Sequence, residues 1–173
     1  MQLSHSQPTR ARAEPLYSPE ERKRRDATPW TLVQGILAPL QFLVFLVSLA
    51  LVVRTLTTGE GYFAATASVV IKTLVLYAIM VTGAIWERVV FGRYLFAPAF
   101  FWEDVMSMLV LALHTAYLVA IAFQWGTPTA QMGLALVAYA AYVVNAAQFV
   151  LKLRAARLDE RAATLEPALE GTK

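Results

Sequence analysis

The chain contains no cysteine and only two histidines among its 173 residues. The missing thiols exclude disulfides, cysteine nucleophiles, iron–sulfur clusters and cysteine-based zinc sites. Because His5 lies in a polar N-terminal stretch, His114 is the one histidine inside the apolar sequence, which argues against a metal site built from several histidines. We therefore expect no metal bound by the protein itself.

Charged residues are also scarce, since they make up 16% of the chain, whereas 58% of its residues are hydrophobic. This composition is too apolar for an ordinary soluble domain and predicts an integral membrane protein. The first 29 residues are polar and basic, so no removable signal peptide is expected. The net charge of +3 reflects membrane topology and does not indicate nucleic-acid binding.

Four apolar runs are each long enough to cross about 30 Å of hydrocarbon as a helix that rises about 1.5 Å per residue. They predict helices over residues 30–53, 62–86, 98–123 and 128–151. The predicted fold is an all-α integral membrane protein, a four-transmembrane-helix bundle that occupies residues 17–158. We expect a disordered N-terminal tail at residues 1–16 and a C-terminal tail at residues 159–173.

The charged ends of these runs predict the topology. Ser18-Pro19-Glu20-Glu21 supplies an N-cap, a first-turn proline and a capping-box glutamate, so it opens a short helix. We expect this basic helix to lie on the membrane surface. Thirteen of the fourteen Lys and Arg residues outside the predicted spans fall on the side of the two termini. The positive-inside rule therefore places both termini in the cytoplasm.

The third predicted helix carries polar groups along one face. At helical spacing, one stripe contains Glu103, Ser107, Val110, His114 and Tyr117, and Asp104 is adjacent to it. Ionisable groups near the centre of a bilayer cost about 3 kcal/mol each, so they are seldom kept without a partner or a function. The alternative explanation is structural: the helix dipole stabilises acids in a first turn, and a buried histidine often links two helices.

Lys72 lies about nine residues from the nearer end of the second predicted helix, which is about 14 Å and a long reach to the membrane surface. We therefore expect a partner, either a carboxylate of another helix or an acidic ligand. Near the end of the same helix, Glu87 and Arg88 are typical of an interfacial ion pair.

Five segments of the chain are distinctive. They are RRDATPWTLVQG (24–35), TGEGY (58–62), KTLVLYAIMVTGAIWERVVFGRYLF (72–96), FFWEDVMSMLVLALHTAY (100–117) and YVVNAAQFVLKLRAAR (142–157). Together they resemble the 2-vinyl bacteriochlorophyllide hydratase family, also called chlorophyllide 3-vinyl hydratase, over about residues 17–158.

The resemblance implies a lyase that adds water across the 3-vinyl group of a chlorophyllide-type tetrapyrrole, giving a 3-(1-hydroxyethyl) group in bacteriochlorophyll biosynthesis. It implies that no redox cofactor is needed. The magnesium would be carried by the substrate. The host would be an anoxygenic phototroph, with the protein in its cytoplasmic or intracytoplasmic photosynthetic membrane.

Hydration of a vinyl group requires a positioned acid, a held water and a base. We hypothesise that Glu103 or Asp104 is the acid, and that its partner carboxylate or His114 orients the water. The alternative role for His114 is ligation of the substrate's magnesium. The substrate-binding candidates are Lys72, Arg88 and Arg93 for the propionate, Trp86, Phe100, Phe101 and Trp102 for ring stacking, and Tyr117 and Asn145 for hydrogen bonds.

Two alternatives remain open from the sequence. A non-enzymatic pigment carrier or assembly factor would need the same binding groups but no acid. A proton-coupled transporter would use Lys72, His114 and the acids as a relay and should show an internal repeat, which is not found. The expected partners are the tetrapyrrole and membrane lipid, with a second copy of the chain or neighbouring pathway enzymes left open.

Overall fold

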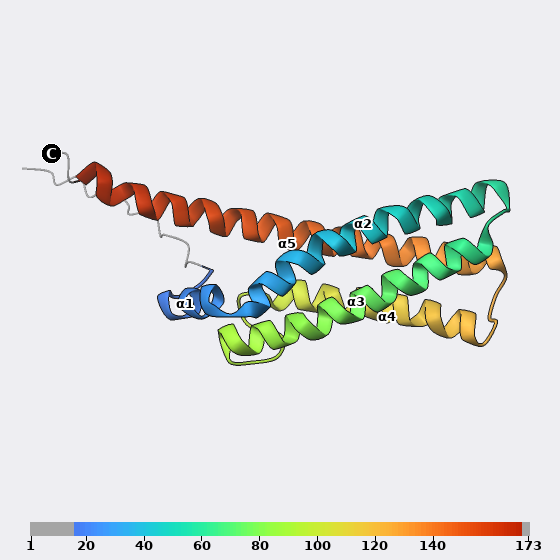
Figure 1. Ribbon diagram of the computed structural model, residues 1–173, viewed down its shortest axis with the longest axis horizontal. Helices are drawn as coiled ribbons and strands as arrows, with labels where there is room; N and C mark the ends of the chain where they lie inside the picture. Colours follow the sequence, from blue (N-terminus) through green and yellow to red (C-terminus); the bar gives the residue numbers. More distant parts are fainter. Residues whose placement is uncertain (1–15, 171–173) are drawn as a thin grey trace, which may run out of the picture.

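A computed structural model describes residues 16–170, which form five helices and no strand (Figure 1). The short helix α1 (Pro19–Ala27) precedes four long ones, which are α2 (Pro29–Thr58), α3 (Tyr62–Phe91), α4 (Phe101–Ala122) and α5 (Pro128–Glu170). The all-helical prediction is confirmed for this part of the chain. Residues 1–15 and 171–173, which belong to the two predicted tails, lie outside the described residues.

Four of these helices are long and apolar enough to cross a membrane. They are α2, α3, α4 and the segment Pro128–Asp159 of α5. Large hydrophobic side chains cover their outer surface, for example Leu43, Val47 and Val137, each more than half exposed. A surface covered so widely by apolar side chains suits lipid rather than water. The prediction of four spanning helices is confirmed by length and composition.

The helix starts agree with the predicted caps. Ser18 Oγ accepts a hydrogen bond from the Glu21 N–H (3.3 Å), and the Glu21 carboxylate accepts one from the Ser18 N–H (2.8 Å), so the capping box of α1 is confirmed. The Thr28 hydroxyl caps α2 by accepting from the Trp30 N–H (3.4 Å).

Several helix ends differ from the limits of the apolar runs. α2 and α3 continue to Thr58 and Phe91, where Gly59 and Gly92 adopt left-handed conformations (φ 76° and 82°) that end each helix. α5 continues to Glu170, because the charged segment after its apolar run is rich in good helix formers. α4 starts only at Phe101, after a turn closed by a hydrogen bond from the Phe100 N–H to the Ala97 carbonyl.

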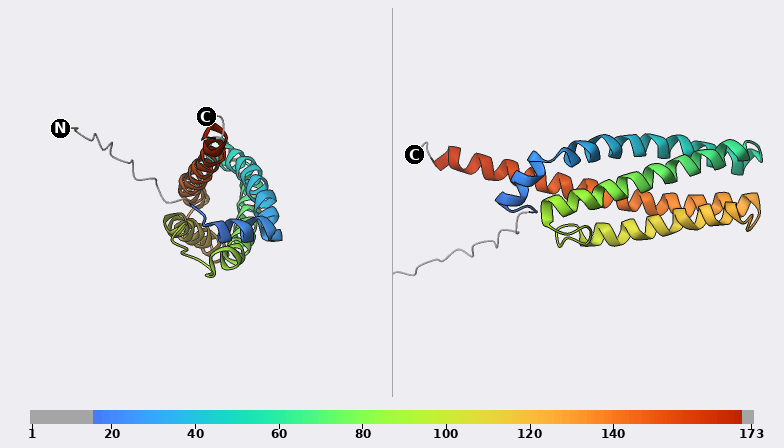
Figure 2. Two further views of the ribbon diagram at one scale, coloured as in Figure 1. Left: turned by 90° about the vertical axis from the view of Figure 1, so that its left-hand side faces the viewer. Right: turned by 60° about the horizontal axis from the view of Figure 1, so that its bottom comes forward.

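The spanning helices form two hairpins, α2–α3 and α4–α5, that lie along each other (Figures 1 and 2). Helices are in close contact within each hairpin, and the two hairpins meet through α2 against α5 and α3 against α4. Phe45, Val69, Val110 and Tyr139 are buried where they meet. Both hairpins therefore contribute to the interior of the bundle.

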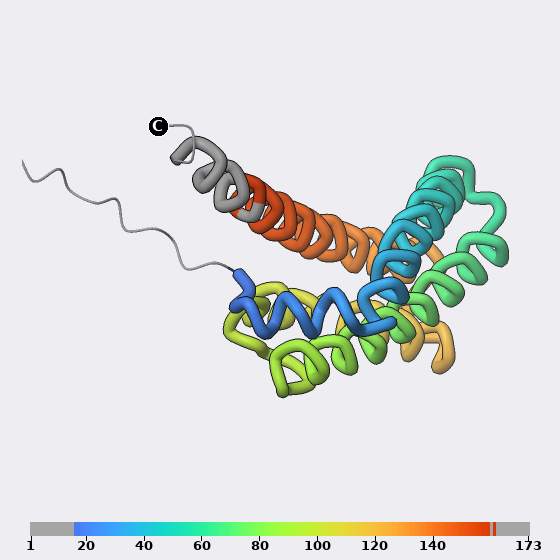
Figure 3. The backbone as a smooth tube through the Cα atoms, turned by 60° about the vertical axis from the view of Figure 1, so that its left-hand side comes forward, coloured from blue at the N-terminus to red at the C-terminus, as the bar shows by residue number. Residues whose placement is uncertain are grey.

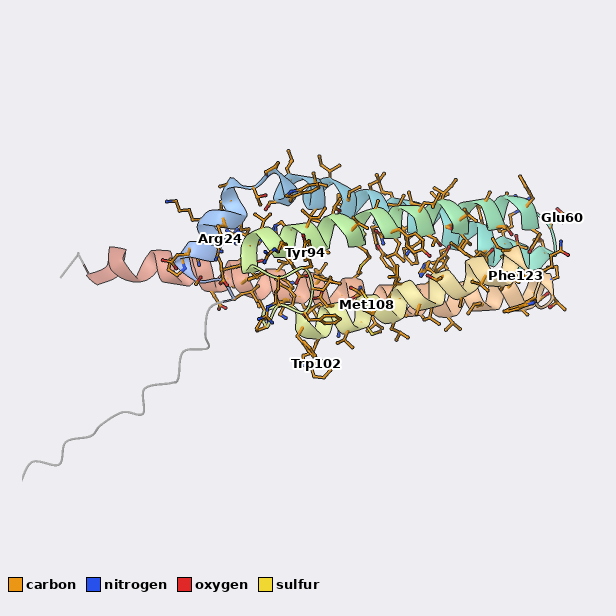
Figure 4. All side chains as sticks on the ribbon, turned by 90° about the horizontal axis from the view of Figure 1, so that it is seen from below. Arg24, Glu60, Tyr94, Trp102, Met108 and Phe123 are labelled. Atoms are coloured by element: carbon orange, nitrogen blue, oxygen red, sulfur yellow. The ribbon has the colours of Figure 1, made fainter. Side chains whose placement is uncertain are left out.

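α1 lies across one end of this bundle. In the view along the bundle, α1 is seen from the side and the long helices are seen from their ends (Figure 2). Figure 3 shows α1 leading into α2, and α1 packs against α3. Tyr17, just before α1, is buried and stacks on Phe91 of α3 with a ring-centroid distance of 5.8 Å. We refer to this end of the bundle as the α1 end. Arg24 and Tyr94 mark it in Figure 4, and Glu60 and Phe123 mark the opposite end.

Candidate functional site

The polar face predicted for the third helix is confirmed. The buried residues of α4 are Glu103, Asp104, Ser107, Val110, His114 and Tyr117. Helical spacing places them along one side of α4, and that side faces the other helices rather than the surface. The groups along it divide between two places, one at the α1 end and one in the middle of the bundle.

The first place is a cluster of four charged side chains from three helices, Glu87 of α3, Glu103 and Asp104 of α4, and Lys152 of α5, which we call the acid cluster. The Lys152 Nζ lies 2.6 Å from the Glu103 Oε2. The Asp104 and Glu87 carboxylates accept hydrogen bonds from consecutive N–H groups of the α3–α4 loop. These bonds come from Phe96 at 2.7 Å and from Ala97 at 3.3 Å.

Glu103 and Asp104 have different surroundings in this cluster. The Lys152 ammonium balances the charge of Glu103, whereas Asp104 lies close enough to Glu87 for the charges of the two carboxyl groups to interact. Two ionised carboxylates at this separation repel, and one proton between them replaces the repulsion by a hydrogen bond. Asp104 and Glu87 are therefore the two acids of this cluster that can share a proton.

The sequence interpretation of Glu87 as the partner of Arg88 is wrong. Glu87 is only 6% exposed and turns towards the loop, while Arg88 donates a hydrogen bond to the Gly92 carbonyl at the end of α3. The error arose because α3 continues to Phe91, so Glu87 lies one turn inside the helix, where its side chain reaches the α3–α4 loop. The sequence holds no local signal of the contact with Asp104.

The loop that Glu87 and Asp104 hold is conformationally unusual. Phe96 has a left-handed backbone (φ 58°), which costs about 1–3 kcal/mol for a residue with a side chain. The hydrogen bond from its N–H to Asp104 and a ring contact with Phe101 (5.8 Å) offset this cost. The acid cluster thus also fixes the path of the chain between α3 and α4.

The second place surrounds Lys72 of α3, which is fully buried (0% exposed). Its Nζ lies 3.9 Å from the ring centroid of Tyr142 and 5.8 Å from that of Tyr139, both on α5. His114 of α4 is close enough to Lys72 for their charges to interact, and its ring centroid is 5.9 Å from that of Tyr139. We call these four residues the buried lysine site. Among the residues that the structure describes, no hydrogen-bond partner reaches the Lys72 Nζ.

The hydrogen bond of His114 defines its free nitrogen. Its Nδ1 lies 2.8 Å from the Val110 carbonyl oxygen, which can only accept, so Nδ1 carries the proton in this arrangement. The Nε2 of a neutral ring then presents a lone pair, and within the described chain it has no partner. A buried imidazole held in this way can accept a proton or ligate a metal ion.

The two places are well separated along α4. Asp104 and His114 are ten positions apart, which corresponds to about 15 Å at the rise of an α-helix. These two side chains therefore cannot both act on the same two-carbon group. Between them, the Asn145 side chain of α5 donates to the Ser107 hydroxyl (2.9 Å), and Tyr117 is buried about one turn beyond His114.

The remaining predicted residues lie around the α1 end. Trp86 donates to the Thr31 hydroxyl (2.9 Å) and packs against Phe100, which is buried (ring centroids 5.8 Å apart). Phe101 and Trp102 are exposed, and Figure 4 shows Trp102 projecting away from the bundle. The two arginines, Arg88 and Arg93, are exposed as well. The structure thus does not bring these residues together into one pocket.

An open groove of about 700 Å³ lies at the opposite end of the bundle. Its walls come from α3, from the end of α4 and from the start of α5, and include Tyr62, Thr66, Leu118 and Gln131. The Tyr62 hydroxyl donates a hydrogen bond to the Gln131 side chain across this groove. The acid cluster is remote from it, because Glu87 and Asp104 lie at the α1 end.

Comparisons with known proteins agree over most of the chain. The model of the family described as 2-vinyl bacteriochlorophyllide hydratase matches residues 17–155. A relative of that name from Cereibacter sphaeroides is 70% identical over 148 residues, which cover 86% of this chain and 92% of the relative. Another of the same name from Rhodobacter capsulatus is 72% identical over 144 residues, covering 83% of this chain and 84% of the relative. No solved structure matches.

Proposed function

This chain belongs to the 2-vinyl bacteriochlorophyllide hydratase family, and we propose that it adds water across the 3-vinyl group of chlorophyllide a or of a bacteriochlorophyllide precursor. The product is the 3-(1-hydroxyethyl) derivative, and the enzyme is a hydro-lyase of bacteriochlorophyll biosynthesis. The observation that carries this proposal is the identity of about 70% to hydratases over nearly the whole membrane domain. Because adding water transfers no net electrons, the reaction requires no redox cofactor, and the magnesium belongs to the substrate.

The reaction requires one proton donor and one proton acceptor. The π electrons of the vinyl group take a proton at the terminal carbon, which becomes a methyl group, and leave a cation on the internal carbon beside the macrocycle. Conjugation with the macrocycle delocalises this charge. The oxygen of a water then bonds to the internal carbon, and the proton that this water loses passes to a base. That proton restores the acid, so the protein ends the cycle as it began.

Asp104 is the better candidate for the acid. Glu103 is engaged by Lys152 at 2.6 Å, whereas Asp104 lies near the Glu87 carboxyl, and this pair can hold one proton between them. After Asp104 has given up its proton, a neighbouring carboxylate of the acid cluster can accept the proton of the attacking water. His114, about 15 Å further along α4, is too far away for this role and is better suited to ligate the substrate's magnesium through Nε2.

The other predicted residues are assigned to binding. Trp86 and Phe100 lie beside the acid cluster and are suited to stack on the macrocycle, while the exposed Phe101 and Trp102 are suited to a substrate that approaches from lipid. Asn145 and Tyr117 offer hydrogen bonds in the interior. The propionate requires a cation, for which Lys72, Arg88 and Arg93 are the candidates.

We place both termini in the cytoplasm and α1 on the membrane surface. The support is that α1, the α3–α4 loop and the charged part of α5 share the α1 end, where ten of the eleven described Lys and Arg residues outside the predicted spans are found. The membrane would be the cytoplasmic or intracytoplasmic photosynthetic membrane, where substrate and product are made and used.

The test is to express the chain in membranes and supply chlorophyllide a without any added cofactor. Product is followed by mass and by the red absorption band. We expect a gain of one water and a blue shift of this band, because hydration removes the vinyl group from conjugation. Binding of the pigment to folded protein without a change in mass would contradict the proposal and favour a non-enzymatic pigment carrier.

A further inference from the structure

Lys72 carries a buried amino group for which the described chain offers no hydrogen-bond partner. Its ammonium group has three N–H donors, and no acceptor reaches them among residues 16–170. The ring face of Tyr142, 3.9 Å away, attracts the cation but supplies no oxygen or nitrogen to accept a hydrogen bond. A charge kept inside the membrane in this state points to a ligand that supplies the missing anion.

The neighbouring polar groups are largely engaged with each other. The Ser48 hydroxyl contacts the Tyr139 hydroxyl at 2.6 Å and the Ser68 hydroxyl at 2.7 Å. Thr73 donates to the Val69 carbonyl (2.8 Å), and His114 Nδ1 bonds the Val110 carbonyl. Among the buried polar atoms left without a partner in the described chain are the Lys72 Nζ and the His114 Nε2, together with others such as the Gln41 Oε1, the Asn145 Oδ1 and the Tyr117 hydroxyl. The two nitrogens of the buried lysine site therefore remain available to a ligand.

The two nitrogens come from different hairpins. Lys72 belongs to α3 of the first hairpin, whereas His114, Tyr139 and Tyr142 belong to the second. A ligand lying between the hairpins would meet both nitrogens. Along α4 this position is about 15 Å from the acid cluster, so a flat ligand can have one edge at each place.

We propose that the buried lysine site binds the propionate carboxylate of the macrocycle, with the 3-vinyl group directed to the acid cluster. This inference rests on the proposed function. The carboxylate supplies the acceptors that the Lys72 ammonium lacks, and the Tyr142 ring holds the ammonium on its other side. Arg88 and Arg93 are the competing cations, but both are exposed, where water and salt weaken an ion pair.

The test compares chlorophyllide with its propionate methyl ester, which keeps the shape of the macrocycle and removes the negative charge. Binding is measured by the quenching of tryptophan fluorescence, and turnover is measured separately. We expect wild-type protein to bind the acid at least about tenfold more tightly than the ester. The Lys72→Met protein should lose this preference and bind both the acid and the ester as weakly as the wild-type protein binds the ester. Arg54→Gln, which removes an exposed cation at the opposite end, is the matched control and should keep the full preference.

Equal binding of acid and ester by wild-type protein overturns this assignment. This comparison uses only the wild-type protein, so it does not depend on whether a variant folds. Loss of the preference in Arg93→Gln but not in Lys72→Met also overturns it, because the carboxylate would then bind at the surface. If the wild-type protein binds the acid preferentially but hydrates neither compound, the hydratase function fails while the carboxylate site stands.

Discussion

Lys152 of α5 reaches Glu103 of α4 with an Nζ–Oε2 distance of 2.6 Å, while the adjacent Asp104 has the Phe96 N–H as its partner at 2.7 Å. Consecutive residues of a helix point about 100° apart, so neighbours in sequence meet different parts of the fold. This contrast gives the two acids different chemistry and leads to the first two predictions.

Asp104→Asn should lower kcat by about 10²-fold or more, because the amide cannot give a proton to the vinyl group. Glu103→Gln should keep most of the activity, since its carboxylate is engaged by Lys152. Initial rates with chlorophyllide would be compared at equal amounts of folded protein, judged by thermal unfolding in detergent. The assignment is reversed if Glu103→Gln is the inactive variant.

Lys152→Met should destabilise the protein by about 1–3 kcal/mol, because Glu103 is 9% exposed and would lose the partner of its charge. Adding Glu103→Gln to this variant should recover much of the loss, since the amide needs no counter-charge. The measurement is a double-mutant cycle of unfolding free energies. Strictly additive effects of the two substitutions would argue against a coupled pair.

Tyr139→Phe should cost about 0.5–1.5 kcal/mol of stability, because it removes the hydroxyl that contacts Ser48 at 2.6 Å and keeps the ring. Ser48 retains Ser68 as a partner, so the loss should stay in this range. The free energy of unfolding in detergent gives the value, with Tyr94→Phe, at an exposed position, as the control. An unchanged stability would mean that the contact contributes nothing.

The sequence was sufficient to predict which residues of α4 face inward, because helical periodicity is a local property of about fifteen residues. It was not sufficient for Glu87, whose partner Asp104 is brought close by the reversal of the chain at Phe96 and Ala97. Likewise, the distance of Lys72 from the ends of its apolar run indicated that it needs a partner, but its neighbour Tyr142 is seventy positions away on another helix. Such contacts depend on how the hairpins meet, which no local pattern encodes.

Tyr17→Ala should release α1 from the bundle, because the Tyr17 ring is 3% exposed and packs on both Phe91 and Phe100. Removing a buried aromatic ring of this size typically costs about 3–5 kcal/mol. Trypsin should then cut faster in the basic run of α1 while the spanning helices stay intact. Cleavage at the wild-type rate would show that this ring does not hold α1.

The absence of native cysteine allows a direct test of topology. Glu60→Cys places a thiol at the opposite end of the bundle, and Lys23→Cys places one in α1, both at exposed positions. A maleimide that cannot cross membranes should label only the first variant on intact cells and both after permeabilisation. Labelling of Lys23→Cys on intact cells would place the α1 end outside the cytoplasm.

The two-hairpin construction has a consequence for how the protein assembles. Before the hairpins meet, the first exposes the Lys72 side chain to lipid, and the second exposes the His114 imidazole. Each of these groups is costly in hydrocarbon. When one hairpin docks on the other, these groups are removed from contact with lipid at the same time. The residues that serve the ligand therefore also favour association between the hairpins, so that an unassembled half is itself unstable in the bilayer.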